Sequence, residues 1–190
     1  PRSTRTDALS PYTPRYRSVG PRDEGACERD TSLLADRLKT SGYGYRVVNA
    51  SASGETTRGA LARLPRALEK HHPAVVIVEL GGNDGLRGLP VRDVRSNLDS
   101  IVRLSRKSGA KVLLIGMRIP PNYGPSYTRD FHQVFAEVAN QYKLPLVPFF
   151  LDGIALDDGL MQEDGLHPSA SAQPKLLAQV WPVMQPLLTR

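Results

Sequence analysis

The sequence predicts an α/β fold in which a parallel sheet carries helices on both faces. Two observations point to it. Residues 74–80 and 111–117 are nearly continuous apolar runs, which are typical of strands buried on both faces. Segments with the periodicity of amphipathic helices separate such runs along the chain. Strands that alternate with helices in this way form right-handed βαβ units, so the sheet is expected to be parallel.

The elements after residue 31 can be placed in order. Strands are expected at 45–50, 74–80, 111–117 and 144–150. Helices are expected at 32–40, 56–71, 91–108, 129–142 and from 169 to about 180. Proline cannot continue the helical hydrogen bonding, so we expect an interruption near Pro65 and an end near Pro182. A chain of 190 residues is long enough for one domain with a sizeable core.

Residues 1–31 differ from the rest of the chain. They contain six Arg, no Lys and four Pro, and their apolar residues neither alternate nor cluster as those of a strand do. We therefore expect an atypical N-terminal segment at 1–31, frame-shifted or disordered, and a folded domain at 32–190. A first strand is not recognisable in this segment.

Composition argues against several classes of protein. The net charge is +6, but Lys and Arg are dispersed along the chain without a nucleic-acid-binding motif, so no nucleic-acid partner is expected. The single cysteine, Cys27, excludes an internal disulfide and argues against a Cys-based metal site. No apolar run approaches the ~20 residues of a membrane span, so no stable membrane insertion is expected. The apolar stretch of a secretory signal is not visible either.

Three segments that can carry chemistry follow predicted strands. Residues 51–56 follow the strand at 45–50, residues 81–85 follow the strand at 74–80, and residues 164–167 lie in the long connection after 150. The carboxyl ends of parallel strands meet at one edge of a sheet, where ligands bind. We therefore expect these segments to converge there.

The residue types in these segments suit acyl transfer, which needs a nucleophile, a base and an oxyanion hole. His167 is the candidate base, and Asp164 can accept a hydrogen bond from its Nδ1. The backbone N–H of Gly54 and the side-chain amide of Asn83 are candidate donors to an oxyanion. Each has a simpler interpretation: a capping Asp beside a surface His, a turn Gly, and an Asn in a Gly-rich turn. No serine stands at an obvious nucleophile position.

The order of these residues resembles the blocks of the SGNH, or GDSL, hydrolase superfamily. Gly54 matches the second block, residues 81–84 the third and residues 164–167 the last. Residues 48–56, 79–88, 116–124 and 164–168 look most like the bacterial subgroup of acyl-thioesterases, arylesterases and lysophospholipases. The resemblance covers about residues 32–188.

This resemblance implies a flavodoxin-like three-layer α/β/α sandwich. It also implies a serine esterase or thioesterase that hydrolyses acyl or aryl esters, acyl thioesters or lysophospholipids through an acyl-serine intermediate. No metal or cofactor is implied, and the partner is a small-molecule ester or thioester. By the same resemblance the protein is expected to be periplasmic or secreted, and we expect a monomer.

The N-terminal block departs from the family pattern. Where the family has Gly-Asp-Ser after a buried strand, this chain has Thr6-Asp7-Ala8-Leu9-Ser10, which puts Ala8 at the nucleophile position. Three explanations are open: a coding sequence read in a shifted frame, a nucleophile displaced to Ser10, and a non-catalytic relative that binds an acyl ligand. Without a serine at position 8 and without a first strand, we expect the chain to lack the middle of its sheet, to fold poorly and to be inactive.

Overall fold

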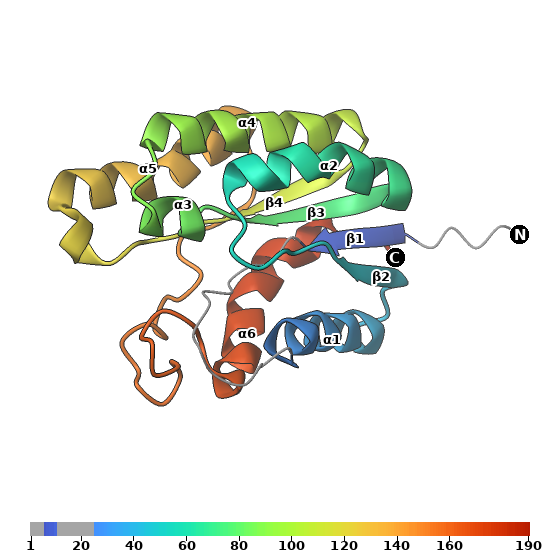
Figure 1. Cartoon of the computed structure of the whole chain (residues 1–190). Coiled ribbons are helices and arrows are strands. Elements are labelled where there is room, and N and C mark those ends of the chain that lie inside the picture. The colour runs from blue at the N-terminus through green and yellow to red at the C-terminus, as the bar shows by residue number, and fades with distance from the viewer. Residues whose placement is uncertain (1–5, 11–24) are drawn as a thin grey trace, which may run out of the picture.

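The computed structural model describes residues 6–10 and 25–190, with side chains from residue 31 onward. All five strands run parallel, in the order β2-β1-β3-β4-β5 (Figure 1). Their bounds are β1 Thr6–Ser10, β2 Tyr45–Asn49, β3 Pro73–Glu79, β4 Lys111–Ile115 and β5 Leu146–Val147. The order β2-β1-β3 reverses direction beside β1, which is the usual place of a ligand site in such a sheet.

The strand β1 corrects the expectation that the sheet lacks its middle. Thr6–Ser10 pairs with β2 over its whole length and with β3 through Asp7, Ala8 and Leu9. This pairing uses backbone groups on both sides, so it does not require the apolar run by which a central strand is recognised in a sequence. The expectation that the chain has no first strand is therefore wrong.

Helices cover both faces of the sheet. On one face lie α2 (Thr57–His71), α4 (Val91–Lys107) and α5 (Pro125–Tyr142), and on the other lie α1 (Gly25–Thr40) and α6 (Gln173–Met184) (Figure 1). Shorter helical turns occupy the connections: α3 (Gly82–Leu86), η1 (Pro121–Tyr123), η2 (Ala170–Ala172) and η3 (Gln185–Leu187). The three-layer α/β/α sandwich expected from the resemblance is confirmed.

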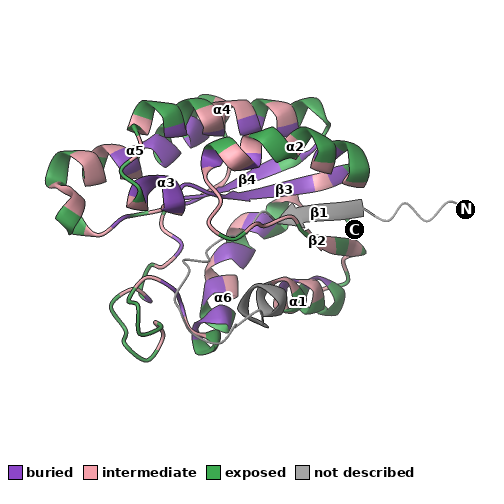
Figure 2. Ribbon diagram, viewed as in Figure 1, coloured by how far each residue is buried: buried purple, intermediate pink, exposed green. Residues whose placement is uncertain are grey.

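Two apolar cores, one on each face, hold the layers together. Side chains alternate along a strand, so Val76 and Val78 of β3 enter the core beneath α2, α4 and α5, whereas Val75 and Ile77 enter the core beneath α1 and α6. In Figure 2 the buried surfaces are the strands β3 and β4 and the helix faces turned toward them. Fully burying one such side chain stabilises the fold by roughly 1.5–3 kcal/mol.

Several predicted boundaries are confirmed and others shift. The strand at 45–50, the strand at 74–80 and the helix at 91–108 lie within one residue of β2, β3 and α4. The helix expected at 32–40 begins earlier, at Gly25, and the helix expected at 129–142 begins at Pro125. The strand expected at 144–150 is reduced to Leu146–Val147.

Neither proline interrupts its helix. Pro65 lies inside an uninterrupted α2, contrary to the prediction, whereas α6 continues through Pro182 and ends close to the predicted position, at Met184. A proline inside a helix costs about 3 kcal/mol because one backbone hydrogen bond is lost. Packing offsets this cost, since Leu68 follows Pro65 into one core, and Trp181 and Met184 flank Pro182 in the other. Tertiary burial therefore decides the lengths of these helices.

Gly116, directly after β4, allows a close approach of two chain segments. Its N–H donates to the Val147 carbonyl at 2.8 Å, and its carbonyl accepts from Phe150 N at 3.1 Å. A Cβ at this position would lie 2.9 Å from the carbonyl carbon of Pro148. Backbone cannot rotate aside as a side chain can, so the segment after β5 would have to move.

We therefore predict that Gly116→Ala lowers the free energy of unfolding by about 1–3 kcal/mol through overpacking. Gly44→Ala is the matched control, because a Cβ there meets nothing within 4 Å. The control should be neutral or slightly stabilising. Urea denaturation of both variants measures the difference, and equal stability of the two would contradict the close approach at Gly116.

Candidate active site

The connection between β5 and α6 folds into a tight turn that carries Asp164 and His167. Met161 forms an isolated antiparallel bridge with Pro168, and Gln162 N donates to the His167 carbonyl at 2.7 Å. Gly165 takes a positive φ of 65° between the two candidate residues. A β-branched residue would be strained there, so this glycine suits the turn.

Asp164 holds both the turn and the imidazole. Its Oδ1 accepts from the backbone N–H groups of Leu166 at 2.9 Å and His167 at 3.0 Å, and its Oδ2 lies 2.5 Å from His167 Nδ1. The simpler interpretation of Asp164 as a capping residue is thus also correct, but that of His167 as a surface residue is not, because His167 is buried. One carboxylate fixes both the backbone and the ring of His167.

The surroundings of Asp164 favour its ionised form. Burial alone would raise the pKa of this carboxyl group, but the hydrogen bonds from the His167 imidazole and from the backbone N–H groups of His167 and Leu166 outweigh it. The pKa of Asp164 therefore lies below the ordinary 3.8. A permanent negative charge beside Nδ1 keeps the proton of a neutral imidazole on that nitrogen.

The loop after β2 and the helix α3 are joined to each other. Asn83 Nδ2 donates to the Glu55 carbonyl at 3.0 Å, and Arg87 Nη2 donates to the Gly54 carbonyl at 3.0 Å. Gly54 has a φ of 70°, and Asn83 is buried at the start of α3. Residues 81–85, interpreted from the sequence as a Gly-rich turn, lie mostly in the short helix α3. Gly54 and Asn83 therefore lie in two segments that cannot move independently.

Asp84 is a further part of this junction, and no role was expected for its side chain. It is buried, with Oδ1 accepting from Thr57 Oγ1 at 2.6 Å and Oδ2 from Thr57 N at 2.9 Å. Asn97 Nδ2 of α4 donates to Thr57 Oγ1 at 3.0 Å. Burial raises the pKa of Asp84 above 3.8, and the hydrogen bonds from Thr57 offset part of that rise. The residue after Asn83 thus anchors α3 to the start of α2.

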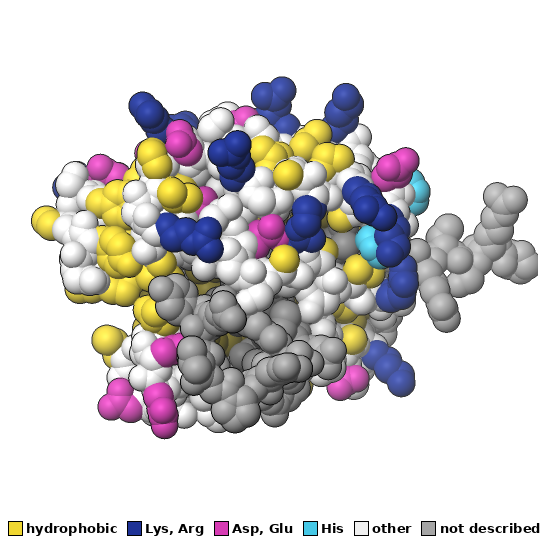
Figure 3. Space-filling view, in the orientation of Figure 1, with side chains coloured by type: hydrophobic (Ala, Val, Ile, Leu, Met, Phe, Trp, Pro, Cys, Tyr) yellow, Lys and Arg dark blue, Asp and Glu magenta, His cyan; other side chains and the backbone are white. Residues whose placement is uncertain are grey.

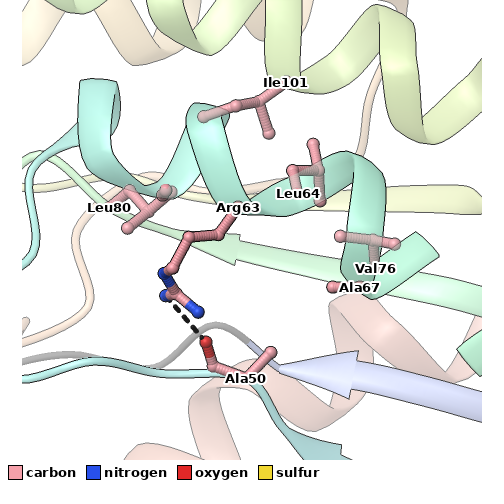
Figure 4. A pocket seen from close by; sticks show the side chains of 8 residues that line it. Ala50, Arg63, Leu64, Ala67, Val76, Leu80 and Ile101 are labelled. Atoms are coloured by element: carbon pink, nitrogen blue, oxygen red, sulfur yellow. Dashed lines mark hydrogen bonds between the residues drawn. The ribbon is translucent and has the colours of Figure 1, made fainter. Parts of the chain in front are cut away.

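Arg63 of α2 supports the other end of the same loop. Its Nη2 donates to the Ala50 carbonyl at 3.1 Å, directly after β2, and it forms an ion pair with Glu55. Figure 4 shows the Arg63 side chain reaching down from α2 to Ala50 beside the apolar residues Leu64 and Leu80. The loop that carries Gly54 is therefore held from α2 and from α3.

His167 and Asn83 line one cavity of about 90 Å³ at the carboxyl edge of the sheet. Apolar side chains form most of its wall: Leu86, Met117, Ile119, Pro120, Phe150, Leu151, Leu166 and Pro168. Glu79, Gly82 and Arg118 complete it. Figure 3 shows hydrophobic side chains gathered on the left of the molecule, where Figure 1 places α3 and the start of α5, while Lys and Arg are scattered elsewhere on that face.

The two nucleophile positions lie on β1. Ala8 is in the middle of the strand, opposite Val75 of β3, and Ser10 is its last residue, opposite Asn49 at the end of β2. The backbone of Ser10 is therefore at the carboxyl edge, on the same side of the sheet as the loop with Gly54. The side chains of Ala8 and Ser10 lie outside the described residues.

The three-layer α/β/α fold is that of the SGNH hydrolases, and comparison with known proteins agrees. Residues 18–173 match the GDSL-like Lipase/Acylhydrolase family, so the chain belongs to that family. It is 52% identical over 175 residues to "Esterase TesA" of Pseudomonas aeruginosa, a match that covers 90% of this chain and 87% of that protein. It is 42% identical over 157 residues to "Thioesterase 1/protease 1/lysophospholipase L1" of Escherichia coli, with 83% and 74% covered.

A solved structure supports the same assignment. The psychrotrophic esterase EstA from Pseudoalteromonas sp., in a crystal structure inhibited by monoethylphosphonate, superposes with a TM-score of 0.82 at 34% identity. The match covers 95% of this chain and 97% of that chain. The resemblance inferred from residues 32–188 and its predicted fold are thereby confirmed.

The lowered pKa of Asp164 predicts how stability depends on pH. Above 3.8 the ionised carboxylate stabilises the folded state, and this contribution is lost only as the pH falls through the lower pKa of the folded protein. We predict that Asp164→Asn costs about 1.5–3 kcal/mol at pH 7, the range for hydrogen bonds to a charged group. The difference in the free energy of unfolding between the wild type and Asp164→Asn should not decrease between about pH 7 and about 5.

Urea denaturation at several pH values measures this difference, and Asp36→Asn, at an exposed position on α1, is the control. A difference that already shrinks well above pH 3.8 would show that the pKa of Asp164 is not lowered.

Proposed function

We propose that this protein is a serine esterase that hydrolyses acyl or aryl esters, and acyl thioesters, through an acyl-serine intermediate. The observation that carries the proposal is the His167 imidazole, fixed by Asp164 on a mostly apolar cavity that Asn83 also lines. The relatives bear the names esterase and thioesterase, and EstA is inhibited by a phosphonate, a reagent class that reacts with activated serines.

In the proposed mechanism His167 is the general base. The Asp164 carboxylate accepts from Nδ1–H, so Nε2 carries the lone pair that takes the proton of the serine hydroxyl. The alkoxide attacks the ester carbonyl, and the protonated imidazole then donates to the leaving group. Water hydrolyses the acyl-serine by the same sequence of steps. None of these steps requires a metal or a cofactor.

Asn83 and Gly54 are the proposed oxyanion donors. An amide nitrogen carries two hydrogens, and the one that Asn83 donates to the Glu55 carbonyl orients the group so that the second can face the substrate oxygen. The anchors at Asp84 and Arg87 hold α3 against the Gly54 loop, so the two donors need no reorganisation during the reaction.

Ser10 is our proposed nucleophile. Ala8 carries only a methyl group and cannot attack a carbonyl, whereas Ser10 ends β1 at the carboxyl edge of the sheet. The competing proposal is a non-catalytic relative that binds an acyl ligand in the same cavity. Hydrolysis of an aryl ester such as 4-nitrophenyl butyrate separates the two, because a binding module gives occupancy without turnover.

Several further properties belong to this proposal. We infer a monomer whose hydrolase domain comprises residues 32–190 together with β1, which carries Ser10, acting on small esters or thioesters in the periplasm or outside the cell. Nucleic acid is not among its proposed partners. Among the helices that the structure describes, none combines the length and apolar character that crossing a membrane requires.

We predict that His167→Ala lowers kcat for aryl esters by about 10³-fold or more, because the serine then has no base. His71→Ala, at the end of α2 outside the cavity, is the matched control and should leave kcat unchanged. Initial rates with a 4-nitrophenyl ester measure both variants. Full activity of His167→Ala would refute the assignment of the base.

We predict that Asn83→Ala lowers kcat by about 10²–10³-fold with little change in KM, because an oxyanion donor acts on the transition state more than on the bound ester. Steady-state kinetics on the same ester distinguish the two parameters, and thermal unfolding checks that α3 stays folded. A rise in KM alone would instead make Asn83 a substrate-positioning residue.

A further inference from the structure

An arginine on the wall of the catalytic cavity has no part in the mechanism above. Arg118 follows β4 by three residues and is exposed, and its side chain lines the cavity together with Asn83 and His167. The remaining wall is mainly apolar, which suits an acyl chain. A guanidinium at the exposed side of such a cavity needs a different explanation.

Two contacts hold the Arg118 side chain in place. Its guanidinium carbon lies 5.0 Å from the centroid of the Phe149 ring, within the range of a cation–π interaction. Its Nη2 lies 3.4 Å from His132 Nε2, while His132 Nδ1 lies 3.3 Å from the Met117 carbonyl. A carbonyl only accepts, so Nδ1 carries the hydrogen and Nε2 accepts from Arg118. The guanidinium is thus oriented by neutral groups.

Arg118 forms no ion pair with a carboxylate of the described residues, unlike several arginines elsewhere on the surface. Arg63, Arg95 and Arg103 form ion pairs with Glu55, Glu137 and Asp99. Within residues 31–190, whose side chains the structure describes, no Asp or Glu oxygen lies within 4 Å of the Arg118 guanidinium. Its charge is therefore available to a ligand in the cavity.

We propose that Arg118 determines specificity by binding an anionic oxygen group, of the phosphate type, that the substrate carries within a few bonds of the scissile carbonyl. The inference rests on the proposed esterase function of the same cavity. Arginine presents its N–H groups as a planar fork that matches phosphate oxygens. We place the anion in the leaving group, close to the ester, because Arg118 is exposed whereas most of the cavity wall is apolar and suits the acyl chain.

The position of the anion distinguishes two kinds of phosphate-bearing substrate. In 1-butyrylglycerol 3-phosphate the phosphate is separated from the ester by the glycerol carbons alone. In butyryl-CoA the phosphates are at the far end of the long pantetheine arm, outside a cavity of about 90 Å³. We therefore expect Arg118 to act on the first substrate and not on the second.

The test compares two matched pairs of substrates. One pair is 1-butyrylglycerol 3-phosphate and neutral 1-butyrylglycerol, and the other is butyryl-CoA and the neutral thioester S-butyryl-N-acetylcysteamine. For Arg118→Gln we expect kcat/KM on the glycerol phosphate ester to fall about tenfold or more, mainly through KM, since a charge-assisted hydrogen bond is lost. The value of kcat/KM on neutral 1-butyrylglycerol should stay unchanged. The ratio of the two kcat/KM values within the thioester pair should stay unchanged as well.

Two control variants accompany the test. Arg92→Gln removes the same charge from an exposed position on α4 outside the cavity and should change neither ratio. Arg118→Lys keeps the charge without the fork and should recover part of the preference for the glycerol phosphate ester. Thermal unfolding at the wild-type temperature confirms that each variant is folded.

The outcomes are separable. If Arg118→Gln leaves the ratio of kcat/KM values within the glycerol pair unchanged, the inference is overturned while the proposed esterase function stands. An equal fall within the thioester pair, or the same fall for Arg92→Gln, would also overturn it, because the effect would then come from the overall positive field. If the wild type hydrolysed none of the four substrates, the proposed function itself would fail, and the inference with it.

Discussion

The site depends on the parallel direction of the five strands, because that direction brings the ends of β1, β2 and β3 to the same edge of the sheet. Two of the segments at that edge are then joined to each other by hydrogen bonds. Asp84 binds Thr57, and Asn83 binds the Glu55 carbonyl, so the helix α3 and the start of α2 form one unit. If the strands were not parallel, these segments would lie at different edges of the sheet. Without the hydrogen bonds, the segments would stay near each other but would move independently. Both levels are needed to hold Gly54 and Asn83, the proposed oxyanion donors, in fixed positions.

The turn that carries His167 is organised separately and more locally. Asp164 uses one carboxylate oxygen to close its own turn and the other to hold the imidazole. This arrangement shows how one carboxylate in a short loop can orient the imidazole of His167, the proposed base. The cavity then joins the two units, since Asn83 comes from one and His167 from the other. Most of the wall of this cavity is apolar, and a site of low polarity strengthens the electrostatic interactions made within it.

The parts of the fold that could be predicted are those with a local signal. The strand β3 is recognisable because both of its faces are buried, and the Asp164–His167 pair is recognisable because its residues are three positions apart. The strand β1 escaped recognition because backbone pairing on both sides stabilises a segment with few apolar residues. Asp84 and Thr57, 27 positions apart, and Arg118 with His132 depend on which loops meet in space. No spacing in the sequence specifies such contacts. The continuous helices through Pro65 and Pro182 show the same limit, since burial overrides a local preference.

Covalent labelling is the decisive test for a serine nucleophile that is deprotonated by His167. The purified protein is treated with a fluorophosphonate, its esterase activity is followed, and the intact mass and the modified peptide are determined by mass spectrometry. We expect one adduct per chain, on the peptide containing Ser10, with activity lost in parallel and with labelling abolished in Ser10→Ala and strongly slowed in His167→Ala. Esterase activity that survives saturating reagent without any adduct would rule out a serine nucleophile, and ligand binding without labelling or turnover would rule out catalysis.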